Sequence, residues 1–235
     1  MKKSILKKVE IIVIFTILVI IGLFIWDKNS HKENLYEISY SIGNIPKYNG
    51  KDYIEINENE PNFSEQDMQN DEYYSELQNE RVGVCMIKAS WDKAKKDEIK
   101  DDFSEIKPTG YKQKKYDEKI VPDGFIYHRC HIIAWMLGGR DVDEKNIMTG
   151  TQNFNMNGMK QFENKVYEYI RKNKSNHVLY RVTPYFEGEN RLATGVNMEA
   201  FSLEDNGKLK FNVFVYNVQD GIIIDYLTGK NKLAE

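Results

Sequence analysis

The segment KNIMTGTQNFNMNGMKQFENKV, Lys145–Val166, leads into a pattern that is typical of a helix. Its apolar residues recur at helical spacing, so they would share one helix face. Basic residues near Lys172 would lie in the last turn, where they suit the negative end of the helix dipole. We therefore predict a helix from near Thr151 to Lys172. The residues that set the spacing are Phe162, Val166, Tyr169 and Ile170.

Short strand-like segments lie on both sides of this helix. They alternate in polarity or are rich in β-branched and aromatic residues, and Gly, Asn and Asp turns separate them. Strands, a helix and then more strands indicate an α+β fold with an antiparallel sheet. The segments are residues 53–56, 81–89 and 124–135 before the helix, and 177–186, 193–203, 208–218 and 221–227 after it.

The composition is that of a globular protein rather than of a strongly basic nucleic-acid binder. Of 235 residues, 41% are hydrophobic and 29% are charged, and the formal net charge is −3. Roughly 200 residues remain beyond the N-terminal segment, enough for one domain with its own core. A partner that carries many phosphates would have to be bound by a local basic surface.

The first 30 residues have the pattern of a membrane-targeting segment. Lysines at positions 2, 3, 7 and 8 precede the apolar run Ile11–Trp26, which Thr16 alone interrupts. No small-residue cleavage site follows, which favours an uncleaved signal anchor. The positive-inside rule then places the rest of the chain outside the cell membrane. We predict a transmembrane helix within residues 1–30, a polar tether at 31–45 and one domain at 46–235. A cleaved segment, and so a secreted protein, is the alternative.

A loop that contains Pro and Gly carries candidate residues for a basic surface. In IKPTGYKQKKY, residues 106–116, tyrosines are interleaved with lysines, a composition that suits contact with a nucleic-acid backbone. Residues 57–80, by contrast, hold eight acids and no Lys or Arg, so they are a poor surface for phosphate. The candidate nucleic-acid-binding residues are Lys107, Lys112, Lys114 and Lys115.

The cluster YHRCH, residues 127–131, suggests several different chemistries. Successive strand residues point to opposite faces, so His128 would share a face with Cys130. Arg129 and His131 would share the other face. This division disfavours a zinc site, which needs four close ligands, and it disfavours a Cys130 nucleophile served by His131. Arg129 with His131 suits phosphodiester chemistry, because arginine binds phosphate and histidine can take a proton from water.

Cysteine usage says little about the compartment. The chain has only Cys85 and Cys130, too few for a disulfide framework. We predict two buried thiols, with a Cys85–Cys130 disulfide as the alternative.

Three residues follow the cluster at regular intervals: Asn155 lies nine residues after Asn146, and Glu163 lies eight after Asn155. With His131 24 residues before Asn155, the pattern resembles the DNA/RNA non-specific endonucleases of the ββα-metal type, including the membrane-anchored and secreted nucleases of Gram-positive bacteria. That family has a D-R-G-H motif at the end of a strand, where this chain has H-R-C-H at 128–131. Further similar pieces, such as IPKYNGKDYIEIN, ERVGV and YRVTPYF, extend the resemblance over roughly residues 45–229.

The resemblance implies an α+β fold with a ββα-metal nuclease core. It also implies a sequence-tolerant endonuclease that hydrolyses DNA, and RNA as a further substrate, with Mg²⁺ or alternatively Mn²⁺ and no small-molecule cofactor. Asn155 would be the sole direct protein ligand of the cation, and its neutral carbonyl oxygen would leave the charge of the ion largely uncancelled. His131 would deprotonate the attacking water, and Arg129 would stabilise the charge of the transition state. Asn146 would orient the site, and Glu163 would hold metal-bound water.

The chain departs from the family motif at His128 and Cys130, which replace Asp and Gly. Strand alternation predicts that both face away from Arg129 and His131, so we expect activity to be retained. A catalytically impaired nucleic-acid-binding protein on the same fold is one alternative. A zinc- or thiol-based exported protein is another.

Overall fold

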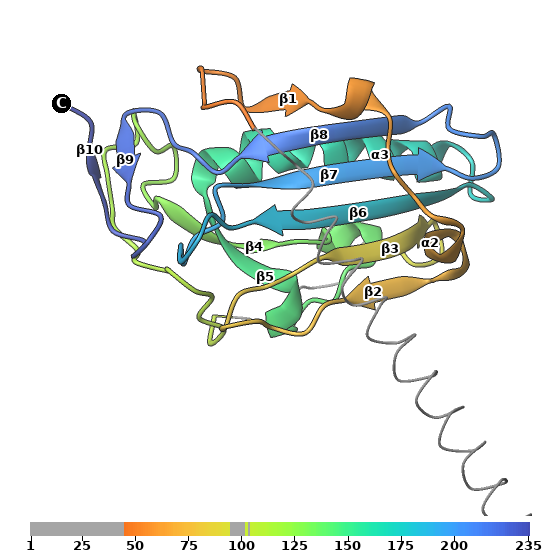
Figure 1. Cartoon of the computed structure of the whole chain (residues 1–235), viewed down its shortest axis with the longest axis horizontal. Helices are drawn as coiled ribbons and strands as arrows, with labels where there is room; N and C mark the ends of the chain where they lie inside the picture. Colours follow the sequence, from red (N-terminus) through yellow and green to blue (C-terminus); the bar gives the residue numbers. More distant parts are fainter. Residues whose placement is uncertain (1–44, 95–101, 103) are drawn as a thin grey trace, which may run out of the picture. The chain divides into compact units, whose positions relative to one another are not determined.

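The computed structural model describes residues 45–94, 102 and 104–235, which belong to one compact unit from Ile45 to Glu235 (Figure 1). The anchor predicted at 1–30 and the tether predicted at 31–45, except for its last residue, lie outside the described residues. No helix in the described part of the chain has the length and apolarity of a membrane span.

A six-stranded sheet forms the centre of the fold, in the order β1-β8-β7-β6-β3-β2. Every neighbouring pair is antiparallel, as predicted, and β6, β7 and β8 run side by side in the middle of the sheet (Figure 1). The strands are Tyr53–Glu55 (β1), Glu72–Tyr74 (β2), Cys85–Ser90 (β3), His177–Tyr185 (β6), Gly195–Ser202 (β7) and Lys210–Tyr216 (β8).

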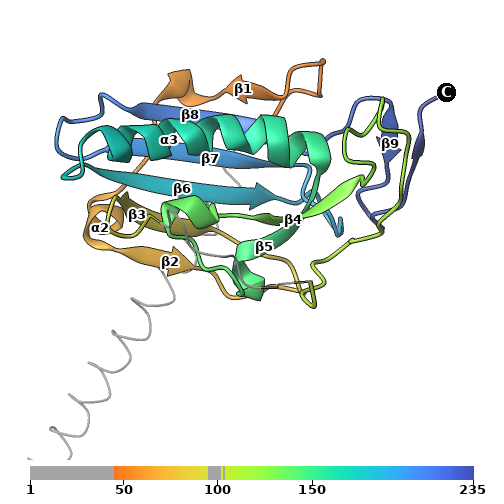
Figure 2. The same ribbon diagram turned by 180° about the vertical axis from the view of Figure 1, so that it is seen from behind.

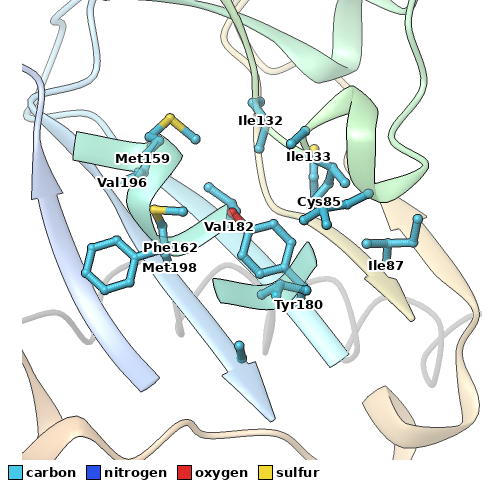
Figure 3. Packing of buried hydrophobic residues seen from close by; sticks show 14 of the residues in the cluster. Cys85, Ile87, Ile132, Ile133, Met159, Phe162, Tyr180, Val182, Val196 and Met198 are labelled. Atoms are coloured by element: carbon cyan, nitrogen blue, oxygen red, sulfur yellow. The ribbon is translucent and has the colours of Figure 1, made fainter. Parts of the chain in front are cut away.

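One face of the sheet is apolar and packs against the helix α3 (Lys160–Lys172), which Figure 2 shows in front of the sheet, running alongside its strands. The residues at helical spacing face this core, where Phe162, Val166 and Ile170 are buried. Figure 3 shows Met159 and Phe162 of the helical segment among side chains from the sheet. Burial of one such side chain stabilises the fold by about 1.5–3 kcal/mol.

A hairpin of β4 (Tyr127–His131) and β5 (Ile147–Thr151) lies on the same face of the sheet as α3 and contributes to the same core. The sequence pattern predicts β4 but not β5, because five residues that read Ile-Met-Thr-Gly-Thr have no clear period of their own. Between the two strands, the chain forms the short 3₁₀ turns η2 (Trp135–Leu137) and η3 (Glu144–Asn146). β5 runs directly into the helical segment, which completes a ββα unit.

The opposite face of the sheet is contacted by the acidic segment around α2 (Glu65–Gln69). Arg181 of β6 is buried there, with its guanidinium 2.7 Å from the carboxylate of Glu199 and 3.1 Å from that of Asp67. The guanidinium also donates to the carbonyl of Asn62. A buried charge needs such partners, so part of the acidic run serves the fold rather than only the surface.

A further two-stranded sheet forms near the C-terminus from β9 (Ile222–Ile224) and β10 (Asn231–Leu233). Its apolar residues join a small cluster with the loop that precedes β4. The hydroxyl of Tyr116 in this loop lies 2.6 Å from Oδ1 of Asn231, which ties the loop to β10. One further short element is the 3₁₀ turn η1 (Asn57–Asn59).

Cys85 and Cys130 are free and buried, which confirms the predicted buried thiols and rejects the disulfide. Burial raises the pKa of each thiol well above the usual range for cysteine. Because the thiolate is the reactive form of cysteine, neither residue is placed to act as a nucleophile.

Candidate active site

A pocket of about 830 Å³ opens where β4, the loop before it and the start of the long helical segment meet. Four of the five residues that the sequence predicts for the site line this pocket. Arg129 and His131 reach it from β4, and Asn155 and Glu163 reach it from the helical segment. The pocket therefore brings together residues that are far apart in the sequence, as the resemblance implies.

The ring of His131 is held by Asp141, in the connection between β4 and β5. Nε2 of His131 lies 2.9 Å from Oδ1 of Asp141 and 3.2 Å from the carbonyl oxygen of the same residue. The carbonyl oxygen of Asp141 accepts the hydrogen bond at Nε2, and its carboxylate lies beside the ring as an ion-pair partner. Both favour the tautomer that carries hydrogen on Nε2, so Nδ1 is the basic nitrogen of the neutral ring. A carboxylate in this position orients a histidine base and stabilises its charged form.

The guanidinium of Arg129 is held by the loop that precedes β4. Its Nε donates to the carbonyl of Ile106 at 2.6 Å, and its Nη1 donates to the hydroxyl of Tyr111 at 3.3 Å. The guanidinium carbon also lies 4.5 Å from the centre of the Tyr111 ring, which is a cation–π contact. Neither partner is negatively charged, so these contacts fix the position of the guanidinium without neutralising it.

Asn155 lies in a π-helical segment, η4 (Phe154–Met159), which precedes α3. The helix predicted from near Thr151 to Lys172 is thus present, with a change of helix type inside it. π-helical turns are rare and often occur at functional sites. Gly158 in this segment allows close contact with β8, since a Cβ there would lie 2.6 Å from Cγ1 of Val215.

The residues after β8 anchor the start of the helical segment. The side-chain oxygen of Asn217, which is buried, accepts a hydrogen bond from the backbone N–H of Thr151 at 2.9 Å. The side-chain oxygen of Gln219 accepts one from the N–H of Asn153 at 3.0 Å. The first bond holds the end of β5. The first N–H groups of a helix have no partner within the helix, so Gln219 satisfies one of them, and both bonds help to fix the position of Asn155.

His128 contacts Asn155, which corrects the prediction that it faces away from the site. Its Nδ1 lies 3.0 Å from Nδ2 of Asn155, its Nε2 lies 2.6 Å from Oδ2 of Asp123, and it lines the same pocket as His131. His128 does share a strand face with Cys130, but this face meets the helical segment, which carries Asn155. The error lay in assuming that the site uses one face of β4 only.

Asn146 lies outside the pocket and is completely buried. Its Oδ1 accepts from the N–H of Ile133 at 2.8 Å, and its Nδ2 donates to the carbonyls of Ile133 at 3.1 Å and Arg140 at 2.7 Å. These hydrogen bonds hold together the two ends of the segment between β4 and β5, which includes Asp141. Any orienting effect of Asn146 on the site would therefore pass through this loop.

A second pocket, of about 1150 Å³, adjoins the first, because Arg129 and Tyr111 line both. Lys107 and Lys112 line this second pocket, and both are exposed. Together with Arg129, they place three positive charges along a pocket whose lining also includes Glu80, Glu105 and Glu144.

Lys114 and Lys115 line neither of these two pockets. Their ammonium groups lie over aromatic rings of the same loop, at 5.0 Å from the centre of Tyr116 and 4.6 Å from the centre of Phe125. Of the four predicted lysines, the structure thus groups Lys107 and Lys112 with Arg129 and separates the other two.

The described residues contain no group of three or more His, Cys, Asp or Glu side chains that could hold a metal ion. The zinc alternative therefore has no support from the described part of the chain. Sequence reasoning also missed Asp123, Asp141 and Lys160, the first and third of which line the pocket. Each lies in a loop or at a helix start without a recognisable local pattern, so only the folded chain identifies it.

Comparisons with known proteins agree with the fold and show the family. The model of the DNA/RNA non-specific endonuclease family matches residues 61–203. A deoxyribonuclease of Streptococcus dysgalactiae subsp. equisimilis is 34% identical over 125 residues, which cover 52% of this chain but only 36% of that protein. NucA from Streptococcus agalactiae, with magnesium bound, has a similar structure, with a TM-score of 0.69, 24% identity, and coverage of 85% of this chain and 95% of NucA. Sda1 nuclease with bound zinc gives a TM-score of 0.58 and 26% identity, and covers 70% of this chain and 81% of Sda1.

Proposed function

The chain belongs to the DNA/RNA non-specific endonuclease family, and from this membership we propose that it hydrolyses phosphodiester bonds of DNA, and of RNA as a further substrate, without sequence preference. One observation carries the proposal: Arg129, His131, Asn155 and Glu163 converge on one pocket. They supply the groups that the reaction needs, namely a positive charge, a base, a hard metal ligand and an acceptor for water.

The pocket suits a divalent cation, Mg²⁺ or Mn²⁺, at Asn155. An amide oxygen is a hard ligand that both ions accept, and the carboxylate of Glu163 lines the same pocket. The magnesium bound in NucA supports this choice. When bound, the cation would supply positive charge to the phosphate and to the leaving oxygen.

His131 would act as the general base. The oxygen of a water molecule forms a bond to phosphorus, the bond between phosphorus and the leaving oxygen breaks, and the proton of the water passes to Nδ1 of His131. Asp141 keeps Nε2 protonated and stabilises the imidazolium that results. General-base catalysis of this kind contributes about 10²- to 10⁴-fold to the rate.

Arg129 would stabilise the negative charge that the phosphate gains in the transition state. Its guanidinium is already fixed by Ile106 and Tyr111, so it needs little reorganisation during the reaction. Lys160, which lines the pocket from the helical segment, adds a second positive charge. Glu163 would accept hydrogen bonds from water and so orient it.

Substrate binding would rest on phosphate contacts. Lys107, Lys112 and Arg129 line the adjoining pocket, and contacts to phosphate carry no information about base sequence. This accounts for a sequence-tolerant nuclease, and it implies binding that weakens strongly as salt increases.

The test is the nicking of supercoiled plasmid with Mg²⁺ or Mn²⁺. We expect nicking by the wild type, loss of nicking with EDTA, and a fall of about 10²- to 10⁴-fold in His131→Ala. Asn155→Ala should also nearly abolish nicking, whereas His177→Ala, at a surface histidine paired with Glu204, should match the wild type. Full activity of Asn155→Ala or of His131→Ala would contradict the proposal.

A second candidate function is nucleic-acid binding without cleavage, and the H-R-C-H sequence in place of D-R-G-H favours it. It predicts that the wild type retards DNA in a gel but leaves plasmid uncut with each divalent cation. Cleavage that depends on His131 would exclude it.

We further propose that the domain acts outside the cytoplasm, held to the membrane by the segment within residues 1–30. The support is the lysine-flanked apolar run of the sequence. A protease added to intact cells should remove the domain from the cell-bound protein, and protection from the protease would contradict this location.

A further inference from the structure

We propose that His128 and Asn155 together form a two-ligand metal site, which binds Mn²⁺ more tightly than Mg²⁺. The inference rests on the proposed function, because it assumes that the pocket works with a divalent cation. A two-ligand site differs from the single-amide site that the family resemblance implies. In this site, the imidazole of His128, which replaces the carboxylate of the family motif, is a metal ligand.

The distance between the two side chains fits two neighbouring ligands of one ion. Nδ1 of His128 lies 3.0 Å from Nδ2 of Asn155. A half-turn of the amide about its Cβ–Cγ bond exchanges Nδ2 and Oδ1, so the oxygen can take the same place. Two ligands at right angles, each about 2.1 Å from an octahedral ion, are about 3.0 Å apart. A cation can therefore be shared by the two residues after the imidazole turns, so that its Nδ1 lone pair points at the ion rather than at the amide of Asn155.

Asp123 prepares the ring of His128 for this role. Its Oδ2 lies 2.6 Å from Nε2 of His128, while its Oδ1 accepts a hydrogen bond from the N–H of Phe125 at 3.0 Å. The hydrogen of the neutral ring thus lies on Nε2, and the lone pair of Nδ1 points toward Asn155. Histidine ligands in metal sites commonly donate their other ring hydrogen to a carboxylate, which fixes the tautomer and increases the basicity of the ligand nitrogen.

An imidazole ligand changes which cation the pocket prefers. Mg²⁺ demands oxygen ligands in a strict octahedron and loses its water reluctantly. Mn²⁺ also suits oxygen ligands, but as a transition metal it accepts an imidazole nitrogen in the same site more readily than Mg²⁺ does. Cys130, on the same face of β4, is buried in the core and does not line the pocket. The site thus has one nitrogen and one oxygen from the protein, and its other positions face a pocket that is open to water and phosphate, as a catalytic site requires.

Metal binding to the purified full-length chain tests the inference without relying on activity. Mn²⁺ affinity is measured from the electron paramagnetic resonance signal of free Mn²⁺, and Mg²⁺ affinity is measured by competition. Electron spin echo modulation of bound Mn²⁺ reports a directly bonded ¹⁴N nucleus. We expect wild type to bind Mn²⁺ at least about tenfold more tightly than Mg²⁺ and to show the ¹⁴N coupling.

Three variants make the test specific. His128→Ala and the size-matched His128→Asn should lose the ¹⁴N coupling and bind Mn²⁺ about 10- to 100-fold more weakly, with an unchanged melting temperature. His128→Asp should lose the coupling and shift the preference toward Mg²⁺, because it supplies an oxygen ligand. The control His177→Ala should behave as wild type.

Unchanged Mn²⁺ affinity and unchanged ¹⁴N coupling in His128→Asn would overturn the inference. That failure differs from failure of the proposed function. If plasmid nicking still depends on Asn155 and His131 while His128 does not affect metal binding, only the two-ligand site is wrong. If Asn155→Ala nicks plasmid as well as wild type does, the proposed function itself is wrong.

Discussion

Asp141 lies against His131 with 2.9 Å between Oδ1 and Nε2, and the two side chains are only 6% and 10% exposed. We predict that Asp141→Asn lowers kcat for plasmid nicking at least about tenfold, because an amide no longer stabilises the protonated ring. KM for DNA should not change, since Asp141 does not line the pocket. Glu118→Gln, an equal loss of charge at an exposed loop position, is the control. A rise in KM with kcat unchanged would argue against a positioning role for Asp141.

Asn146→Ala should destabilise the fold rather than act on the chemistry directly. The change leaves the N–H of Ile133 and the carbonyl of Arg140 without the amide that now binds them. The expected loss of unfolding free energy is about 2–4 kcal/mol, measured by urea denaturation. If stability is unchanged and nicking is lost, Asn146 has a more direct part in the reaction than its buried position indicates.

Gly158→Ala should displace the π-helical segment, because the new methyl group would lie 2.6 Å from Cγ1 of Val215. Overpacking of this kind costs about 1–3 kcal/mol. Nicking should also fall, since Asn155 lies in the same segment. The double variant Gly158→Ala/Val215→Ala removes the clash and should recover much of the lost activity. No recovery would mean that the glycine is needed for another reason.

The two pairs of lysines should differ in their effect on DNA binding. Lys107→Ala/Lys112→Ala should weaken binding and reduce the dependence on salt by about one unit of slope per lysine, because these residues line the adjoining pocket. Lys114→Ala/Lys115→Ala carries the same change of charge at positions outside both pockets. Fluorescence anisotropy with a labelled duplex at several salt concentrations measures the affinity of each double variant and its dependence on salt. Equal losses in the two double variants would show that all four lysines bind the backbone.

The buried thiols should make the fold sensitive to alkali. The pKa of both thiols is raised in the folded state, so the unfolded chain loses these protons first as pH rises above 9.0, and stability falls. At pH 10, each thiol should lower the free energy of unfolding by about 1.4 kcal/mol. Urea denaturation at pH 7.5 and pH 10 measures how much unfolding free energy is lost between the two pH values. This loss should be about 2.8 kcal/mol smaller in Cys85→Ala/Cys130→Ala than in the wild type. An equal pH dependence in both proteins would contradict this account.

The sequence predicts the elements whose pattern is local. Phe162, Val166 and Ile170 recur at helical spacing in the sequence, and their side chains do pack in the core against the sheet. β5 was beyond this reasoning, because its five residues become a strand through pairing with β4 rather than through a period of their own.

The same limit applies to the site. The resemblance of their spacing to the family pattern predicts His131, Asn155 and Glu163, but the role of Asp141 depends on a loop whose path the sequence does not reveal. His128 was assigned to the wrong side because alternation along a strand says which residues share a face, and not which face a distant helix will cover. Contacts made by the folded chain decide both cases.

The bonds from Asn217 and Gln219 to the start of the helical segment have a consequence for the cell that makes this protein. A nascent chain that ends before these residues lacks the groups that anchor the segment carrying Asn155. The segment that carries Asn155 therefore gains these two anchors only after Asn217 and Gln219 have been synthesised, long after the segment itself.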